Sequence, residues 1–253
     1  MSWSLKYNNI ELSTYGLTVA SSGPSLATLL TSDIMQLQDR AYAPDARAPS
    51  KPLNFGIVVR ATTTAQLFSY LSDIKRVCAQ RTAGQLILGI QDDRYYTARF
   101  ERFMGRRVSP LVFEGELNFI ADDPLAYANS ETTEGPTNVD ADPDTIPLDV
   151  GGSAYVKPEF TLIAGEALAA ITLLVENTDT GEEFTWTGTI GNGKSFVIDS
   201  ALWYATNDGS SAMSGINTGS QFPRLIPGTT NHIKVTAFST TGTLTIVYRT
   251  AYL

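Results

Sequence analysis

The second half of the sequence alternates apolar and polar residues, and this pattern constrains the fold more than any other feature. Side chains of a strand point alternately to the two faces of a sheet, so a period of two is typical of half-buried strands. No helical stripe of apolar residues interrupts the alternation. Strands that recur about every ten residues, with turn signals between them, predict a β-sandwich or jelly roll. The apolar positions are Phe160/Leu162, Ile171/Leu173/Val175, Phe184/Trp186, Phe196/Ile198, Ile233/Val235/Ala237 and Leu244/Ile246/Tyr248.

The first half is also expected to be mainly β, but with one helix over about residues 63–81. Leu67, Leu71, Ile74 and Cys78 are spaced four, three and four residues apart, which places them on one helical face. Because Cys78 falls on this apolar face, we interpret it as a small buried hydrophobic side chain rather than a reactive thiol.

Signals at both ends bound this helix. Thr63 and Gln66 have the spacing of a capping box, and Arg81 followed by Gly84 supplies the cation and the breaker expected at the other end. Three strands should follow as an antiparallel meander. They are expected at 85–90, 95–103 and 108–120, with turns at Asp92-Asp93 and Met104-Gly105, and Pro124 should end the sheet.

Two segments are read as irregular. Between Arg40 and Leu53 lie three prolines, which lack the N–H that a helix or a central strand requires, so an extended arm over about Tyr42 to Lys51 is expected. The Thr-, Asp-, Pro- and Gly-rich stretch 129–152 is the best domain boundary. The predicted organisation is a domain over 1–133, a linker over 134–152 and a β-sandwich over 153–253.

Charge separates the two halves. Residues 1–133 carry 13 Lys and Arg against 13 Asp and Glu, whereas residues 134–253 carry 5 against 13, which accounts for the whole net charge of -8. An acidic second half repels phosphate backbones, so nucleic-acid binding there is disfavoured. No apolar run approaches the roughly 20 residues that span a bilayer, and no secretory signal is recognised, so synthesis and folding in a cytoplasm are expected.

Catalytic chemistry finds few candidate residues. The segment from Gly188 to Ser195 matches the phosphate-binding P-loop pattern, but strand periodicity continues after it where a P-loop requires a helix. The single histidine, His232, is out of phase with the apolar positions of its strand and should point to solvent. The adjacent acids Asp92-Asp93, Asp122-Asp123 and Glu182-Glu183 are expected at turns or strand edges. We therefore predict no enzyme, no metal site and no cofactor.

A basic cluster is the best candidate for an interaction surface. Arg94, Arg99, Arg102, Arg106 and Arg107 are interleaved with aromatic residues across a predicted hairpin. Arginine and tyrosine are enriched at the centres of protein interfaces, and the same mixture also suits nucleic-acid contact. A solvated hairpin face remains the simple alternative. The candidate oligomer interface is Tyr42, Arg47, Arg94, Tyr95, Tyr96, Arg99 and Arg102.

A second candidate surface lies in the sandwich. Trp186 shares its phase with Phe184 and should be part of the core, whereas Trp203 and Tyr204 precede the turn signal Asn207-Asp208-Gly209 and should be exposed at a sheet end. Exposed rings can stack on sugars. Trp203, Tyr204 and Asp208 are therefore the candidate ligand or partner surface of the second domain. From these residues, one hypothesis for the function is a carbohydrate-binding module that recognises cell-wall glycans, and it is kept below as the alternative.

Four stretches of the sequence are similar to one known family: Phe119–Tyr127, Gly151-Gly152, the hairpin from Phe184 to Ser200 and the stretch from Phe222 to Asn231. Together they resemble the distal tail proteins of siphophages, and within them those of phages with Gram-positive hosts. The first stretch resembles that family's aromatic–Ala–Asp–Pro–Tyr junction, and the glycine pair resembles the entry to its second domain. One departure is the pair of threonines before Asn231, where a shorter Gly-Asn turn is expected.

The resemblance implies a structural role in the virion. It implies a tail-tube-like first domain, of β-sandwich or barrel type with one helix, that forms a hexameric ring, and a galectin-like or carbohydrate-module-like second domain outside it. Such a ring, possibly stacked on another, joins the tail tube and tape-measure proteins to the tail-tip, fibre or receptor-binding proteins. Genome DNA only passes through its channel, and no membrane insertion is implied.

Overall fold

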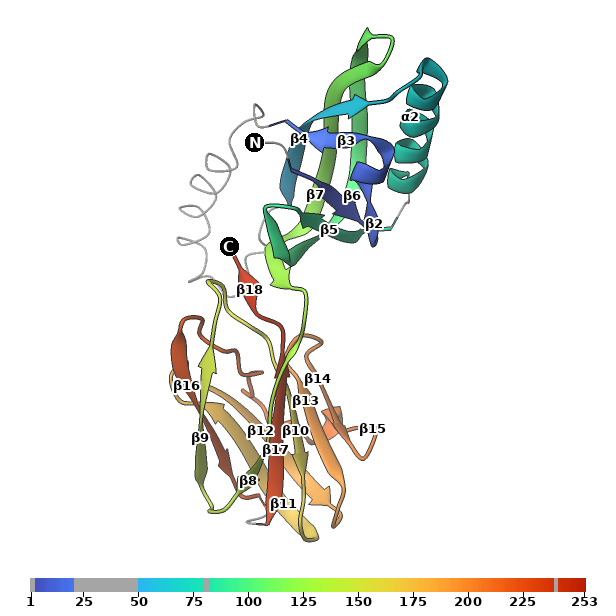
Figure 1. Ribbon diagram of the computed structural model, residues 1–253. Helices are drawn as coiled ribbons and strands as arrows, with labels where there is room; N and C mark the ends of the chain where they lie inside the picture. The colour runs from blue at the N-terminus through green and yellow to red at the C-terminus, as the bar shows by residue number, and fades with distance from the viewer. Residues whose placement is uncertain (1–2, 21–49, 80–81, 239–240) are drawn as a thin grey trace. The chain divides into compact units, whose positions relative to one another are not determined.

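The computed structural model describes residues 3–20, 50–79, 82–238 and 241–253 (Figure 1). The chain divides into two compact units, Met1–Asn129 with Leu253, and Ser130–Tyr252. The described part is mainly β with one α-helix, as predicted. No described helix is long and apolar enough to cross a membrane.

An antiparallel sheet forms the first unit, with its strands in the order β2-β1-β5-β6-β7-β4-β3. A backbone bridge between Trp3 and Val19 joins the chain before β1 to β3, so the two sides of the sheet meet as in a barrel. The expected barrel-like domain is therefore present. The strands are β1 Leu5–Tyr7, β2 Ile10–Glu11, β3 Leu17–Val19, β4 Lys51–Arg60, β5 Gly84–Leu88, β6 Gln91–Ser109 and β7 Val112–Ala128.

Helix α2, Thr64–Cys78, closes the core of this unit. Leu67, Ile74 and Cys78 are fully buried, so the predicted apolar face is confirmed. The Thr63 hydroxyl accepts a hydrogen bond from the Gln66 backbone N–H at 3.1 Å, as a capping residue does. The Gln66 side chain reaches one residue further back than a capping box requires and accepts from the Thr62 backbone N–H at 2.8 Å.

The hairpin of β6 and β7 is longer than predicted. Its turn lies between Ser109 and Val112, and the strand runs straight through Met104-Gly105. Gly105 and Gly115 are paired across the hairpin. A Cβ atom on Gly105 would lie 2.6 Å from the Phe113 ring, and one on Gly115 would lie 2.1 Å from the Met104 carbonyl oxygen. These glycines allow close packing inside a strand and do not form the expected turn.

Strand β7 also continues past Pro124 instead of ending there. The pairing with β6 steps from Ala98↔Ala121 to Tyr96↔Ala126, so residues 122–125 bulge out of the ladder. A proline is tolerated in a bulge because its missing N–H is not needed for pairing there.

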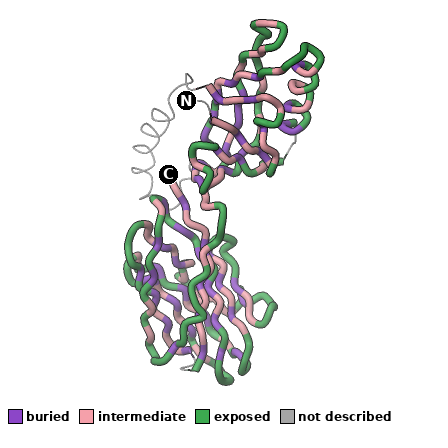
Figure 2. Tube along the Cα trace, in the orientation of Figure 1, coloured by how far each residue is buried: buried purple, intermediate pink, exposed green. Residues whose placement is uncertain are grey.

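Two antiparallel sheets form the second unit, with strand orders β15-β14-β13-β10-β17-β8 and β12-β11-β16-β9. Rings from both sheets pack together inside: the Trp186 and Phe196 ring centroids are 4.6 Å apart, and those of Phe184 and Phe196 are 6.3 Å apart. The buried positions alternate along strands such as β10, β13 and β17 (Figure 2). The predicted β-sandwich is confirmed. Its strands are β8 Thr132–Val139, β9 Asp144–Val150, β10 Glu159–Ile163, β11 Leu168–Asn177, β12 Glu182–Ile190, β13 Ser195–Asp199, β14 Tyr204–Asn207, β15 Ser210–Ser211, β16 Thr229–Thr236, β17 Gly242–Tyr248 and β18 Ala251–Tyr252.

The prediction of a linker over 134–152 was wrong. Most of it forms β8 and β9, the last strand of each sheet, which bury Val139, Leu148 and Val150. Edge strands tolerate proline, because the side of the strand that lacks an N–H can face solvent. Pro136 and Pro147 therefore fit strands that their composition disguised as a linker.

Candidate interaction surfaces

The basic cluster lies mainly on an edge of the first sheet. Strand β5 pairs with β6 only as far as Ala98, so from Arg99 to Ser109 β6 pairs with β7 alone among the described residues. An unpaired edge presents free backbone N–H and C=O groups to a partner strand, and charged side chains on such an edge discourage indiscriminate pairing. The exposed arginines of this edge are Arg99, Arg102, Arg106 and Arg107.

These arginines point to two different faces of the sheet. Arg107 reaches toward helix α2, with its guanidinium 5.9 Å from the centroid of the Phe68 ring. Arg102 and Arg106 lie on the opposite face, because they alternate with Phe103, which is paired with the buried Leu117. We name Arg99, Arg102, Met104 and Arg106 the β6 strip, and Arg106 lies directly opposite Glu114 of β7.

The other expected interface residues are not part of this strip. Arg94 binds the neighbouring Asp93 carboxylate through Nε at 3.0 Å and Nη2 at 2.9 Å, and these contacts lower the pKa of Asp93. Tyr95 is half-buried, with its ring centroid 6.2 Å from that of Tyr127. Tyr96 is only 4% exposed and belongs to the core, so including it in an interface was wrong. Tyr42 and Arg47 lie outside the described residues.

The Asp–Pro–Tyr junction is organised around one carboxylate. Asp123 accepts a hydrogen bond from the Leu125 N–H at 3.0 Å and another from the Tyr127 hydroxyl. Burial, followed by this contact with Asp123, raises the pKa of Tyr127. The neighbouring Asp122 points elsewhere and forms an exposed ion pair with Arg99 at 3.4 Å. The adjacent acids thus serve the bulge of β7 and do not form a paired site.

In the second unit, Trp203 lies in the turn between β13 and β14 and is 62% exposed, and Tyr204, the first residue of β14, is 39% exposed. Asp208 follows the other end of β14, roughly 15 Å away at the usual rise of a strand. Its carboxylate forms an ion pair with Lys194 at 2.9 Å. The structure therefore confirms that both rings are exposed but does not bring Asp208 to them. The predicted core position of Trp186 is confirmed, and its indole N–H donates to the Ala212 carbonyl at 2.9 Å.

The segment that matches the P-loop pattern is a turn between strands β12 and β13. The Gly193 N–H donates to the Ala164 carbonyl at 2.7 Å, and the Lys194 N–H donates to the Gly191 carbonyl at 3.1 Å. A P-loop instead points free amide groups at phosphates from the start of a helix. Two amides of the turn are thus already bonded, and a strand follows it where nucleotide binding uses a helix.

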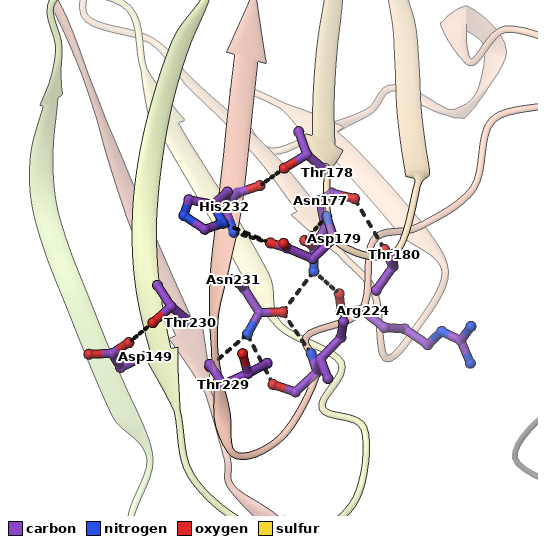
Figure 3. A network of polar contacts seen from close by, with 11 residues as sticks. Asp149, Asn177, Thr178, Asp179, Thr180, Arg224, Thr229, Thr230, Asn231 and His232 are labelled. Carbon is purple, nitrogen blue, oxygen red and sulfur yellow. Dashed lines mark hydrogen bonds and ion pairs between the residues drawn. The ribbon is translucent and has the colours of Figure 1, made fainter.

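A network of polar side chains holds the turn after β11 against the chain that enters β16 (Figure 3). Asn231 is fully buried, and its Oδ1 accepts hydrogen bonds from Asn177 Nδ2 at 2.9 Å and from the Ile226 N–H at 2.7 Å. Asn177 is also fully buried and donates to the Arg224 carbonyl at 2.6 Å. This network was not predicted from the sequence, although a polar residue at a core position of β16 is a signal for it.

His232 lies beside this network and is exposed, as predicted. Its Nδ1 is 3.0 Å from Asp179 Oδ2, and the same oxygen accepts a hydrogen bond from the His232 backbone N–H at 2.6 Å. This backbone hydrogen bond is the main cause of the lowered pKa of Asp179. The nearby Thr178 hydroxyl donates to the His232 carbonyl at 3.2 Å rather than to the ring. The arrangement fixes a turn and presents no activated nucleophile.

The adjacent acids of β12 lie on opposite faces of the strand. Glu182 is nearly buried and binds Arg224, whose Nε donates at 2.7 Å, while the adjacent Glu183 is exposed on the other face of β12. The two carboxylates therefore do not form one site. Within the described ranges, no three His, Cys, Asp or Glu side chains are grouped so that they could hold a metal ion.

Known phage proteins are similar to this chain in sequence or in structure. Residues 151–252 match the family model of the siphovirus-type tail component, C-terminal domain. The crystal structure of the Dit protein (gp 19.1) of phage SPP1 aligns with a TM-score of 0.71 and 15% identity, over 99% of this chain and 99% of that chain. That protein is described as a paradigm of the hub adsorption apparatus in phages that infect Gram-positive bacteria.

A chain from the baseplate of phage p2 in its activated conformation with Sr aligns at a TM-score of 0.37, with 10% identity and 78% of each chain covered. No curated protein sequence matches this chain. Residues 151–252 therefore resemble the siphovirus-type tail components, and the chain shares its fold along its whole length with the SPP1 Dit protein, in agreement with the resemblance seen in its sequence.

Proposed function

We propose that this chain is a non-enzymatic building block of the phage tail tip, where the first unit assembles a hexameric ring hub. The observation that carries the proposal is the likeness to SPP1 Dit, which extends over 99% of both chains and includes both units. In this role the ring joins the tail tube to the host-adsorption apparatus and leaves a channel for DNA. The tail tube, the tape-measure protein and the tip or fibre proteins are its partners.

The β6 strip supports the assembly of a ring. A closed ring requires two different surfaces on each subunit, which meet head to tail. The β6 strip offers one of them, because it combines an unpaired strand edge with exposed arginines and the 44% exposed Met104. Charged groups at an interface give orientation and partner choice more than raw affinity. We therefore assign to Arg99 and Arg102 a role in positioning the neighbouring subunit.

Electron microscopy of the purified chain tests the proposal directly. Negatively stained particles should show a six-fold ring, and native mass spectrometry should show six copies of the 27.4 kDa chain. A monodisperse monomer at micromolar concentration would contradict the ring. The likeness in fold is compatible with a monomer, so this measurement decides a point that the fold leaves open.

A charge reversal tests the β6 strip itself. Arg102→Glu together with Arg106→Glu should shift the ring toward monomers, because it places like charges where the neighbour is expected. Arg76→Glu is the matched control, since Arg76 is exposed on α2 and its ion pair, among the described residues, is with Asp73 of the same helix. If the double variant still forms the ring, the β6 strip is not part of the interface, but the proposed ring itself stands.

The extended arm expected over about Tyr42 to Lys51 remains a prediction. Because Lys51 begins β4, a deletion that tests the arm should be limited to residues 42–49.

A further inference from the structure

The turn between β13 and β14 carries the most exposed apolar side chains of the described chain. Leu202 is 75% exposed and Trp203 is 62% exposed, and no other large hydrophobic residue described exceeds 57%. They are consecutive and are followed by Tyr204, which is 39% exposed. Single exposed apolar residues are common on protein surfaces, whereas adjacent large ones mark interaction sites. We name Leu202 and Trp203 the apolar knob.

The apolar knob is held rigidly by its own turn. The Asp199 carboxylate accepts hydrogen bonds from the backbone N–H groups of Ala201 and Leu202, both at 2.9 Å. Trp203 has a φ of 55°, a left-handed conformation that bulky residues rarely adopt and that persists only where the surroundings impose it. A side chain that is already ordered loses little entropy on binding, and tryptophan is enriched among the residues that dominate binding energy.

A ladder of rings connects the knob to the core of the sandwich. The Trp203 and Phe222 ring centroids are 6.1 Å apart, and Phe222 in turn lies 5.1 Å from the fully buried Phe184. One side of the indole is thus supported by Phe222, while most of the ring remains in solvent. This support fixes the direction in which the indole projects.

Acidic groups border the knob. Tyr204, Asp199 and Glu159 are neighbours across three adjacent strands, on the face of the sheet opposite to the buried row of Ala205, Ile198 and Phe160. Among the described residues, neither carboxylate forms an ion pair. The whole second unit, residues 130–252, carries 5 Lys and Arg against 14 Asp and Glu, a net charge of -9. A complementary partner surface is therefore basic around an apolar centre.

The surroundings favour a protein over a sugar. Sugar sites combine a stacking ring with polar side chains that converge on the hydroxyl groups. Asp208, the acid that the sequence suggested for this role, lies at the far end of β14 and is paired with Lys194. Asp199 Oδ1 already accepts two backbone hydrogen bonds. The knob instead offers a convex aliphatic and aromatic surface, which fits a pocket.

We propose that the apolar knob docks into a second protein of the tail tip, one whose surface has an apolar pocket bordered by lysine or arginine. This inference rests on the proposed function, because it places the partner in the same particle. The second unit then holds a neighbouring protein through Leu202 and Trp203, and Asp199 and Glu159 orient it.

Phage particles that carry Leu202→Ser with Trp203→Gly test the docking. Glycine adopts a positive φ without strain, so the turn is retained while both apolar side chains are removed. Quantitative mass spectrometry of purified particles should show one tail protein reduced at least tenfold relative to this chain. Ile163→Ser is the matched control, because Ile163 is 42% exposed at the other end of the same sheet and its variant should leave the composition unchanged.

A photo-crosslinker at position 202 identifies what covers the knob. With p-benzoylphenylalanine there, illumination of otherwise wild-type particles should join this chain to the same protein, at a peptide that contains lysine or arginine. Crosslinks to a second copy of this chain, or no crosslink together with unchanged composition, would overturn the docking. So would particles of normal composition that lose only binding to cell-wall glycan. If the double variant assembles no particles, the crosslink alone decides. Absence of this chain from wild-type particles would instead overturn the proposed function.

Discussion

At the scale of single residues, the polar positions of this chain mainly hold loops in place. Asn231 satisfies the backbone of the segment before β16, since its side chain accepts from the Ile226 N–H at 2.7 Å and donates to the Ile226 carbonyl at 3.0 Å. The stretch from Phe222 to Asn231 is one of those that resemble the distal tail proteins. Its polar end thus has a structural role, because buried backbone groups require hydrogen-bond partners.

Replacing Asn231 tests this role. Asn231→Ala leaves the Ile226 N–H and the Asn177 amide buried without this acceptor, which should lower the free energy of unfolding of the second unit by about 2–3 kcal/mol. Urea denaturation followed by circular dichroism measures the loss. Asn138→Ala is the control, because Asn138 is exposed on β8 and its replacement should change little. Equal effects in the two variants would show that the network contributes nothing measurable.

Cys78 offers a second test at this scale. Burial against the core raises the pKa of its thiol to about 12, so the reactive thiolate is scarce at neutral and mildly alkaline pH. The native chain should therefore react with a thiol reagent at pH 8 at least a hundredfold more slowly than the chain unfolded in urea. Absorbance of the released chromophore measures both rates. Fast labelling of the native chain would show that the core around α2 opens readily.

At the scale of elements, the spacing of apolar residues and the helix or strand preferences of the residues predicted the kinds of element correctly. They did not predict where the strands end. The helix and six sandwich strands were found at their predicted apolar positions, except that Ala237 lies just after β16. The prediction of a turn at Met104-Gly105 was wrong. The sequence alone does not distinguish a glycine that forms a turn from one that lets an aromatic ring pack closely against the strand. Here Gly105 and Gly115 lie opposite each other beneath Phe113, a contact that depends on strand register. Register is set by pairing with a distant strand and is not visible in one segment.

The glycine pair gives the element-scale prediction. In Gly115→Val, the new Cβ would meet the Met104 carbonyl oxygen at 2.1 Å, so the hairpin must distort. We expect a loss of about 1–3 kcal/mol in the stability of the first unit, in spite of the strand preference of valine. Thermal unfolding measures it, with Glu116→Val as the control at the exposed neighbouring position. A Gly115→Val variant as stable as the control would mean that the close approach is not required.

At the scale of the whole molecule, the sequence predicted two parts with different charge but misjudged their boundary. Threonine, glycine and proline are typical of linkers and also of short edge strands, and only the partners β16 and β17 decide between the two. The candidate surfaces were predicted in part for a related reason. Residue type indicated Arg102 and Trp203, but burial of Tyr96 and separation of Asp208 from Trp203 depend on tertiary packing.

The division into two units leads to a last prediction, on fragments. Each unit contains its own core, so residues 1–129 and residues 130–252 should each fold separately, with β-type circular dichroism and cooperative unfolding. The first fragment, which carries the β6 strip, should retain the ring. The second, with a net charge of -9, should remain a monomer because like charges repel. Native mass spectrometry at matched concentrations distinguishes the two fragments. If the second fragment oligomerised and the first did not, the sandwich would form the ring, and the β6 strip would have to face solvent or a different tail protein.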